Sequence, residues 1–102
     1  MPLDFVVLGD DGAPDRVVPI GVDLHHQLIS IATQFGLHRF DSFSDYYEDA
    51  RIDEGDLLEF RQQVEILRSG TNSPQLLNFV GKLCDLIDYA AEKGKPLHSI
   101  AD

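Results

Sequence analysis

The chain has 102 residues, 43% hydrophobic and 25% charged, which fits one globular domain rather than a disordered chain or a membrane protein. Eighteen acidic and eight basic residues give a formal charge of −10, so the surface repels nucleic acid and anionic membranes and attracts basic partners. No window holds eighteen uncharged apolar residues, and the first residues lack a signal-peptide pattern. We therefore expect one cytoplasmic domain over residues 1–102.

The first twenty residues predict a β-hairpin. Leu3–Leu8 is a short run of aliphatic, β-branched and aromatic residues, and residues 16–20 form a second run. Gly9, Gly12 and Pro14 supply a dense turn signal between them. Because two strands alone are marginally stable, we expect helices to pack on one face of this hairpin.

Two stretches in the middle of the chain carry apolar residues at the spacing of one helical face. The first covers residues 24–35 and is ended by Gly36. The second covers residues 57–67 and ends near Gly70. A shorter helix is predicted over residues 41–50, where large and apolar side chains recur at helical spacing: Phe40, Phe43, Tyr46, Tyr47 and Ala50.

The longest predicted helix starts at Ser73 and ends at Gly94. Ser73 suits the N-cap, Pro74 suits the first helical position, and Gly94 suits the left-handed C-terminal position. Its apolar stripe predicts a core helix and, with Leu77 and Phe79 widening it, consists of Leu76, Val80, Leu83, Ile87, Ala90 and Ala91. The tail from Lys95 onward has no periodicity and is expected to be partly ordered or frayed.

These elements together predict an α+β fold in which an N-terminal β-hairpin is followed by about four α-helices and helix dominates. An alternative stays open at this point: the hairpin fails to form, and the helices make a bundle alone.

Charge is concentrated in residues 41–59, which hold eight acids and the single base Arg51, a net charge of −7. On a helix such acids fall on neighbouring positions, where like charges repel and a cationic partner relieves the repulsion. Acids also favour helix N-termini, so part of this pattern fits helix stabilisation alone. The predicted partner-binding residues are Asp41, Asp45, Tyr46, Tyr47, Glu48, Asp49, Asp53, Glu54, Asp56 and Glu59.

The adjacent pair Tyr46 and Tyr47 lies inside this acidic segment. Neighbouring helical residues point about 100° apart, so one ring facing the core leaves the other at least partly exposed. An exposed tyrosine bordered by carboxylates is a common binding hot spot, while packing of both rings into the core is the alternative.

No pattern of catalytic or metal-binding residues stands out, so we expect neither an enzyme nor a cofactor. The histidines and the single cysteine, Cys84, do not form a ligand set, and the glycine positions do not fit an EF-hand. Cys84 lies beside the apolar stripe and is expected to be a small buried hydrophobe. A looser cation site at residues 10–15 or 53–56 stays open.

The run 45–49, Asp-Tyr-Tyr-Glu-Asp, followed by Asp-Glu-Gly-Asp at 53–56, resembles the toxin-binding surface of small acidic bacterial immunity proteins, notably the nuclease-colicin immunity family. The resemblance covers about a dozen residues, and the predicted hairpin does not belong to that family's four-helix pattern. It implies a protein that binds a basic toxin domain and blocks it without catalysis. Tyr46 and Tyr47 would then be aromatic anchors, and Asp45, Glu48 and Asp49 would pair with toxin Lys or Arg.

The leading hypothesis is therefore an immunity-type inhibitor, of the broad group found in contact-dependent and polymorphic toxin systems, acting as a monomer or weak homodimer. The second is a cytoplasmic adaptor or regulatory module, homodimeric in one version, whose acids only solvate it. The third is a nucleic-acid mimic, which requires carboxylates in rows.

Overall fold

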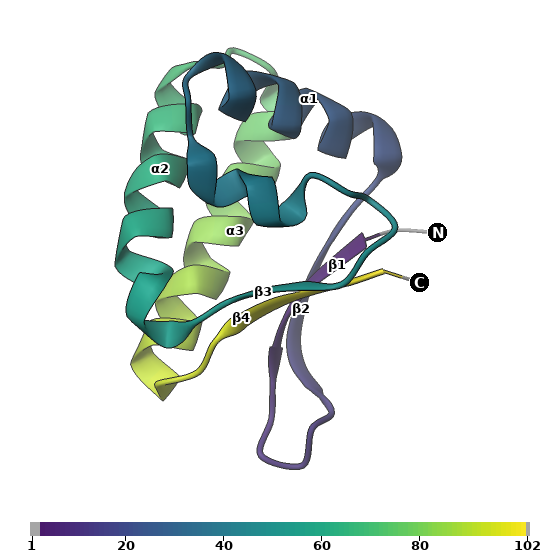
Figure 1. Cartoon of the computed structure of the whole chain (residues 1–102), viewed down its shortest axis with the longest axis vertical. Coiled ribbons are helices and arrows are strands. Elements are labelled where there is room, and N and C mark those ends of the chain that lie inside the picture. Colours follow the sequence, from purple (N-terminus) through teal and green to yellow (C-terminus); the bar gives the residue numbers. More distant parts are fainter. Residues whose placement is uncertain (1–2, 102) are drawn as a thin grey trace.

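A four-stranded antiparallel sheet with helices on one face forms the protein, and the computed structural model describes residues 3–101 (Figure 1). The strands are β1 (Leu3–Leu8), β2 (Pro14–Ile20), β3 (Ala50–Ile52) and β4 (Leu97–Ala101). The helices are α1 (Val22–Gln34), α2 (Leu57–Ser69) and α3 (Pro74–Lys93), with two short 3-10 helices, η1 (His38–Phe43) and η2 (Glu54–Asp56). The predicted α+β class is confirmed.

The predicted N-terminal hairpin forms, although its second strand already begins at Pro14, which was expected to belong to the turn. β1 and β2 pair antiparallel, with Leu3 opposite Ile20 and Val6 opposite Val17. Successive strand residues point to opposite faces, and Leu3 and Phe5 enter the core beneath the helices. The alternative of a helical bundle without a hairpin is therefore wrong.

Helix α3 shows both predicted end signals. The Ser73 hydroxyl accepts a hydrogen bond from the Leu76 backbone N–H at 3.3 Å, which satisfies one free donor of the first turn. Gly94 follows the helix with φ of +65°, and the next N–H, that of Lys95, donates to the Ala90 carbonyl at 2.9 Å. The stripe is buried, with Leu83 fully covered, except at its margins, where Leu77 and Ala91 are exposed. Helices α1 and α2 also occupy the predicted stretches.

The predicted helix over residues 41–50 is wrong. Phe40 and Phe43 lie three residues apart in the 3-10 helix η1, and both rings pack against the ring of Phe60. Their centroids lie 5.0 and 5.5 Å from the Phe60 centroid. Beyond η1 the side chain of Asp45 accepts the Tyr47 N–H at 2.9 Å, a local bond that competes with helical bonding. The chain then extends into β3. In place of the four or so predicted α-helices, residues 3–101 contain three α-helices and two 3-10 helices.

The C-terminal tail, whose order the sequence left open, forms β4. This strand lies between β1 and β3 in the order β2-β1-β4-β3, with Leu3 opposite Ala101 and Ala50 opposite Ser99. Leu97 and Ser99 are fully buried. Its partners are distant in sequence, so local periodicity could not reveal it; Asp102 lies outside the described residues.

Candidate functional site

β3 separates the ten predicted partner-binding residues along the chain into a group before it and a group after it. Before β3, Asp49 Oδ1 accepts the N–H of Ala101 at 2.7 Å, at the end of β4. After β3, the Glu54 carboxylate lies beside Gly94, since a β-carbon built on Gly94 would be 3.6 Å from Glu54 Oε1. β4 spans about 13 Å between these ends. The first group is Asp41, Asp45, Tyr46, Tyr47, Glu48 and Asp49, and the second is Asp53, Glu54, Asp56 and Glu59.

Arg39 neutralises much of the second group. Its Nε lies 2.8 Å from Glu59 Oε1, and its Nη2 lies 3.2 Å from Asp56 Oδ1. His38 Nε2 is also 2.8 Å from the same Glu59 oxygen. The hydrogen bond from Arg39 lowers the pKa of Glu59 and raises the pKa of the guanidinium. The Arg39 backbone N–H donates to buried Gln63 at 2.9 Å, so this base is held in place.

The rest of the second group is also partly paired. Arg51 Nε lies 2.9 Å from Asp53 Oδ1, while Glu54 makes no ion pair with any residue of 3–101. Three of the four acids after β3 thus already have basic partners within the chain. The sequence could not show this for Arg39, which precedes the acidic segment and reaches acids seventeen and twenty residues away.

The first group includes the tyrosine pair, of which Tyr46 contacts β2 and α1. The Tyr46 hydroxyl donates to the Ile20 carbonyl at 3.1 Å, and its ring meets His25 edge-on with centroids 5.1 Å apart. Buried His25 places Nε2 2.6 Å from the Phe43 carbonyl, and because a carbonyl only accepts, Nε2 carries the proton. Tyr47 packs edge-on against Tyr46 at 5.4 Å and is 79% exposed.

The expected difference in exposure between the two tyrosines is therefore observed, although the two residues lie in a turn and not in the predicted helix. Tyr46 is half-buried and supports the loop, whereas Tyr47 presents its ring to solvent. The supporting groups on Ile20 and His25 were missed, because they come from β2 and α1 and no local pattern links them to residue 46.

We call residues 41–49 the Tyr47 loop. Its four acids, which give it a net charge of −4, form no ion pair with any basic side chain in residues 3–101. The carboxylates of Asp45 and Asp49 accept backbone N–H groups, at Tyr47 and Ala101. Asp41 and Glu48 are exposed, and no hydrogen bond holds either side chain to another part of residues 3–101. An exposed aromatic ring amid unpaired carboxylates can receive a cationic partner surface.

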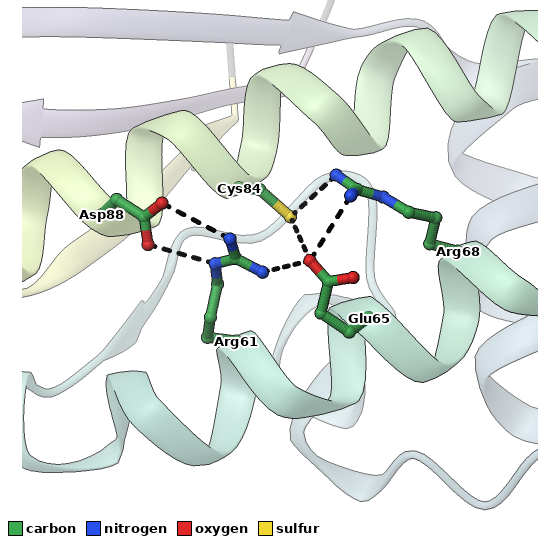
Figure 2. Close-up of polar contacts among 5 residues, drawn as sticks. All are labelled: Arg61, Glu65, Arg68, Cys84 and Asp88. Carbon is green, nitrogen blue, oxygen red and sulfur yellow. Dashed lines mark hydrogen bonds and ion pairs between the residues drawn. The ribbon is translucent and has the colours of Figure 1, made fainter.

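A second polar cluster joins α2 to α3 around Cys84 (Figure 2). Arg61 bonds Glu65 and lies 3.1 Å from Asp88 Oδ1, while Arg68 Nη2 lies 3.4 Å from Cys84 Sγ. The thiol is 3.7 Å from Glu65 Oε1. Burial raises the pKa of the Cys84 thiol despite the two arginines, so it stays protonated at neutral pH. The cluster links the two helices through side-chain bonds.

In residues 3–101, no three His, Cys, Asp or Glu side chains are grouped so as to hold a metal ion. Within the same range, none of the helices combines the length and apolarity needed to cross a membrane. Comparison with protein-family models, curated proteins and solved structures gives no significant match. The geometry of the Tyr47 loop is therefore the basis for a functional proposal.

Proposed function

We propose that this chain is an immunity-type inhibitor of the bacterial cytoplasm, which neutralises a basic toxin domain, a nuclease in the preferred case, by binding it through the Tyr47 loop. The observation that carries the proposal is that Tyr47 is 79% exposed while its ring packs edge-on against the ring of Tyr46. A rigid exposed aromatic loses little conformational entropy on binding, which is why tyrosine is frequent at binding hot spots.

Charge supports the same surface. The acids of the Tyr47 loop are free of intramolecular ion pairs in the described part of the chain, so their field acts on an approaching partner. Steering of this kind raises association rates by about 10- to 1,000-fold and weakens with salt. The acids after β3 contribute less to this field, because Arg39 and Arg51 offset them.

The test first asks whether a neighbouring reading frame encodes a large secreted protein that ends in a basic domain, and then uses that domain as the partner; a neighbourhood without one counts against the proposal. We expect wild-type protein to protect cells that express that domain, and the purified pair to associate quickly at low salt. Tyr47→Ala should speed dissociation and abolish protection. Reversal of Asp41 and Glu48 to Lys should slow association, and these two are chosen because their side chains bond nothing in residues 3–101 outside their own loop.

The matched control reverses two acids on α3, Asp85 and Glu92, which changes the net charge equally while leaving the Tyr47 loop intact. If both double variants slowed association to the same degree at low salt, the overall charge and not this loop would steer the partner. Unchanged binding by Tyr47→Ala would refute the assignment of the anchor.

A homodimeric adaptor is the second candidate, and one observation favours it. Leu58 and Ile66, two turns apart on α2, are 71% and 48% exposed. Sedimentation of wild type beside Leu58→Lys with Ile66→Lys tests the adaptor. A dimer that the double substitution dissociates favours the adaptor, whereas a wild-type monomer at high concentration counts against it. A nucleic-acid mimic is disfavoured, because Arg39 and Arg51 already pair with Asp53, Asp56 and Glu59.

A further inference from the structure

Strand β3 (Ala50–Ile52) borders the sheet with one side unpaired (Figure 1). It pairs antiparallel with β4, and no strand within residues 3–101 lies on its other side. An unpaired edge presents backbone N–H and C=O groups to which an extended segment of another chain can bond. The groups of β3 that point outward therefore decide what this edge can accept.

The hydrogen bond between Asp49 and Ala101 shows which groups these are. The Ala101 N–H, at the end of β4, donates to Asp49 Oδ1 at 2.7 Å, so it points toward β3 and away from β1. Because every second residue of a strand directs its backbone groups to the same side, Ser99 also points toward β3, where it faces Ala50. The next residue, Arg51, then directs its N–H and C=O outward, and neither has another backbone partner within residues 3–101.

The opposite border of the sheet is less open. It is formed by β2, which carries Pro14 and Pro19. Proline has no N–H to donate, and it is typical of edges that do not accept another strand. Residues 44–56, around β3, contain no proline. β3 is therefore the edge on which a further strand can be added.

The charges beside Arg51 select the occupant of this edge. Asp49 and Asp53 lie two residues before and two residues after Arg51, which is the spacing of side chains along one face of a strand. An added strand suits these acids if it places a basic residue opposite each of them. The residue opposite Arg51 must then be neutral, because like charges directly opposite one another repel. The edge thus suits an extended segment with two basic residues four apart and a neutral residue midway.

A second copy of this chain does not meet these demands. Pairing two β3 strands about a two-fold axis at Arg51 places two arginines opposite each other and brings together two acidic segments, residues 41–59, each of charge −7. We propose that the β3 edge binds an extended basic segment of a protein partner as an added antiparallel strand. The proposal rests on the proposed function for the identity of that partner, and it adds a second contact beside the Tyr47 loop.

The experiment titrates the ¹⁵N-labelled full chain with the end-blocked peptide Thr-Lys-Val-Thr-Val-Lys-Thr and follows the backbone amide signals. We expect saturable shifts in residues 49–53, the largest at the Arg51 amide. N-methylation of the central Thr removes the N–H that bonds the Arg51 carbonyl, and should weaken binding by about 2- to 12-fold, the range for one hydrogen bond. The matched control is N-methylation of the Val that follows, whose N–H points away from β3, and it should leave binding unchanged.

Two variants of Arg51 test the same contact from the protein side. Arg51→Pro removes the outward N–H and no bond to β4, so the fold should persist, which thermal unfolding checks. Arg51→Gln removes the same charge but keeps the N–H, and it should bind at least as tightly as wild type, because Asp53 loses its ion pair. We expect Arg51→Pro to bind the peptide about 2- to 12-fold more weakly than Arg51→Gln.

The proposal is overturned if the two N-methylated peptides bind equally, a comparison that needs no protein variant. It is also overturned if folded Arg51→Pro binds like Arg51→Gln, if no amide of residues 49–53 shifts at millimolar peptide, or if a peptide with Glu in place of Lys binds as well. These results leave the proposed function standing, since that function fails instead when Tyr47→Ala leaves binding of the toxin domain unchanged.

Discussion

Replacing Tyr47 with alanine should remove binding while leaving the fold almost intact. Burying a whole tyrosine covers about 150–250 Å². Because Tyr47 is 79% exposed, its ring covers only about a fifth of that area. At about 25 cal/mol per Å², the loss is about 1 kcal/mol of unfolding free energy. The backbone bond from the Tyr47 N–H to Asp45 does not depend on the ring and stays in the variant.

Urea unfolding followed by circular dichroism measures this loss, with Leu83→Ala as the comparison. Leu83 is fully buried on α3, so its truncation should cost about 2–5 kcal/mol. The reasoning is refuted if Tyr47→Ala destabilises the protein as much as Leu83→Ala does, because the ring would then be a core residue. A variant that unfolds like wild type but no longer protects cells would identify Tyr47 as a binding residue.

Three further changes test the structure elsewhere. Gly94→Ala should cost about 1 kcal/mol in thermal unfolding, because φ of +65° is unfavourable for alanine. Cys84 should resist thiol reagents at neutral pH until the protein unfolds, since burial raises its pKa; rapid labelling of the native protein would contradict this. The pKa of Glu59 is lowered chiefly by its hydrogen bond with Arg39. The ionised carboxylate therefore stabilises the fold above the usual pKa of 4.5, and this contribution is lost as the pH falls through the lowered pKa. Melting temperature should therefore fall more gently with acidification in Glu59→Gln than in wild type.

Local sequence signals were sufficient where one short stretch contains everything the element needs. Helix α3 has its cap at Ser73, its apolar stripe and its terminating Gly94 within twenty-two residues, and the structure reproduces all three. The hairpin likewise carries its strands and its turn within the first twenty residues. In both cases the stabilising contacts join residues that are near one another along the chain.

Helical spacing was misleading in residues 41–50, because its apolar residues pack against two different parts of the fold. Phe40 and Phe43 are spaced to bury against Phe60, while Tyr46 is anchored to β2 and α1. A single α-helix would have put the acids of this stretch side by side, whereas the turn at Asp45 lets the chain reach the sheet edge. Periodicity records which residues are buried, but it does not record what buries them.

The sequence by itself determined the hairpin, the three long helices and the place of the acidic segment, since these follow from composition and short-range spacing. Only the tertiary structure decided that the tail becomes an inner strand, that Arg39 neutralises acids beyond β3, and that Tyr47 rather than Tyr46 faces solvent. Each of these outcomes depends on contacts between residues far apart in the chain. Such contacts form only when the sheet and helices close around one core, and no local pattern encodes them.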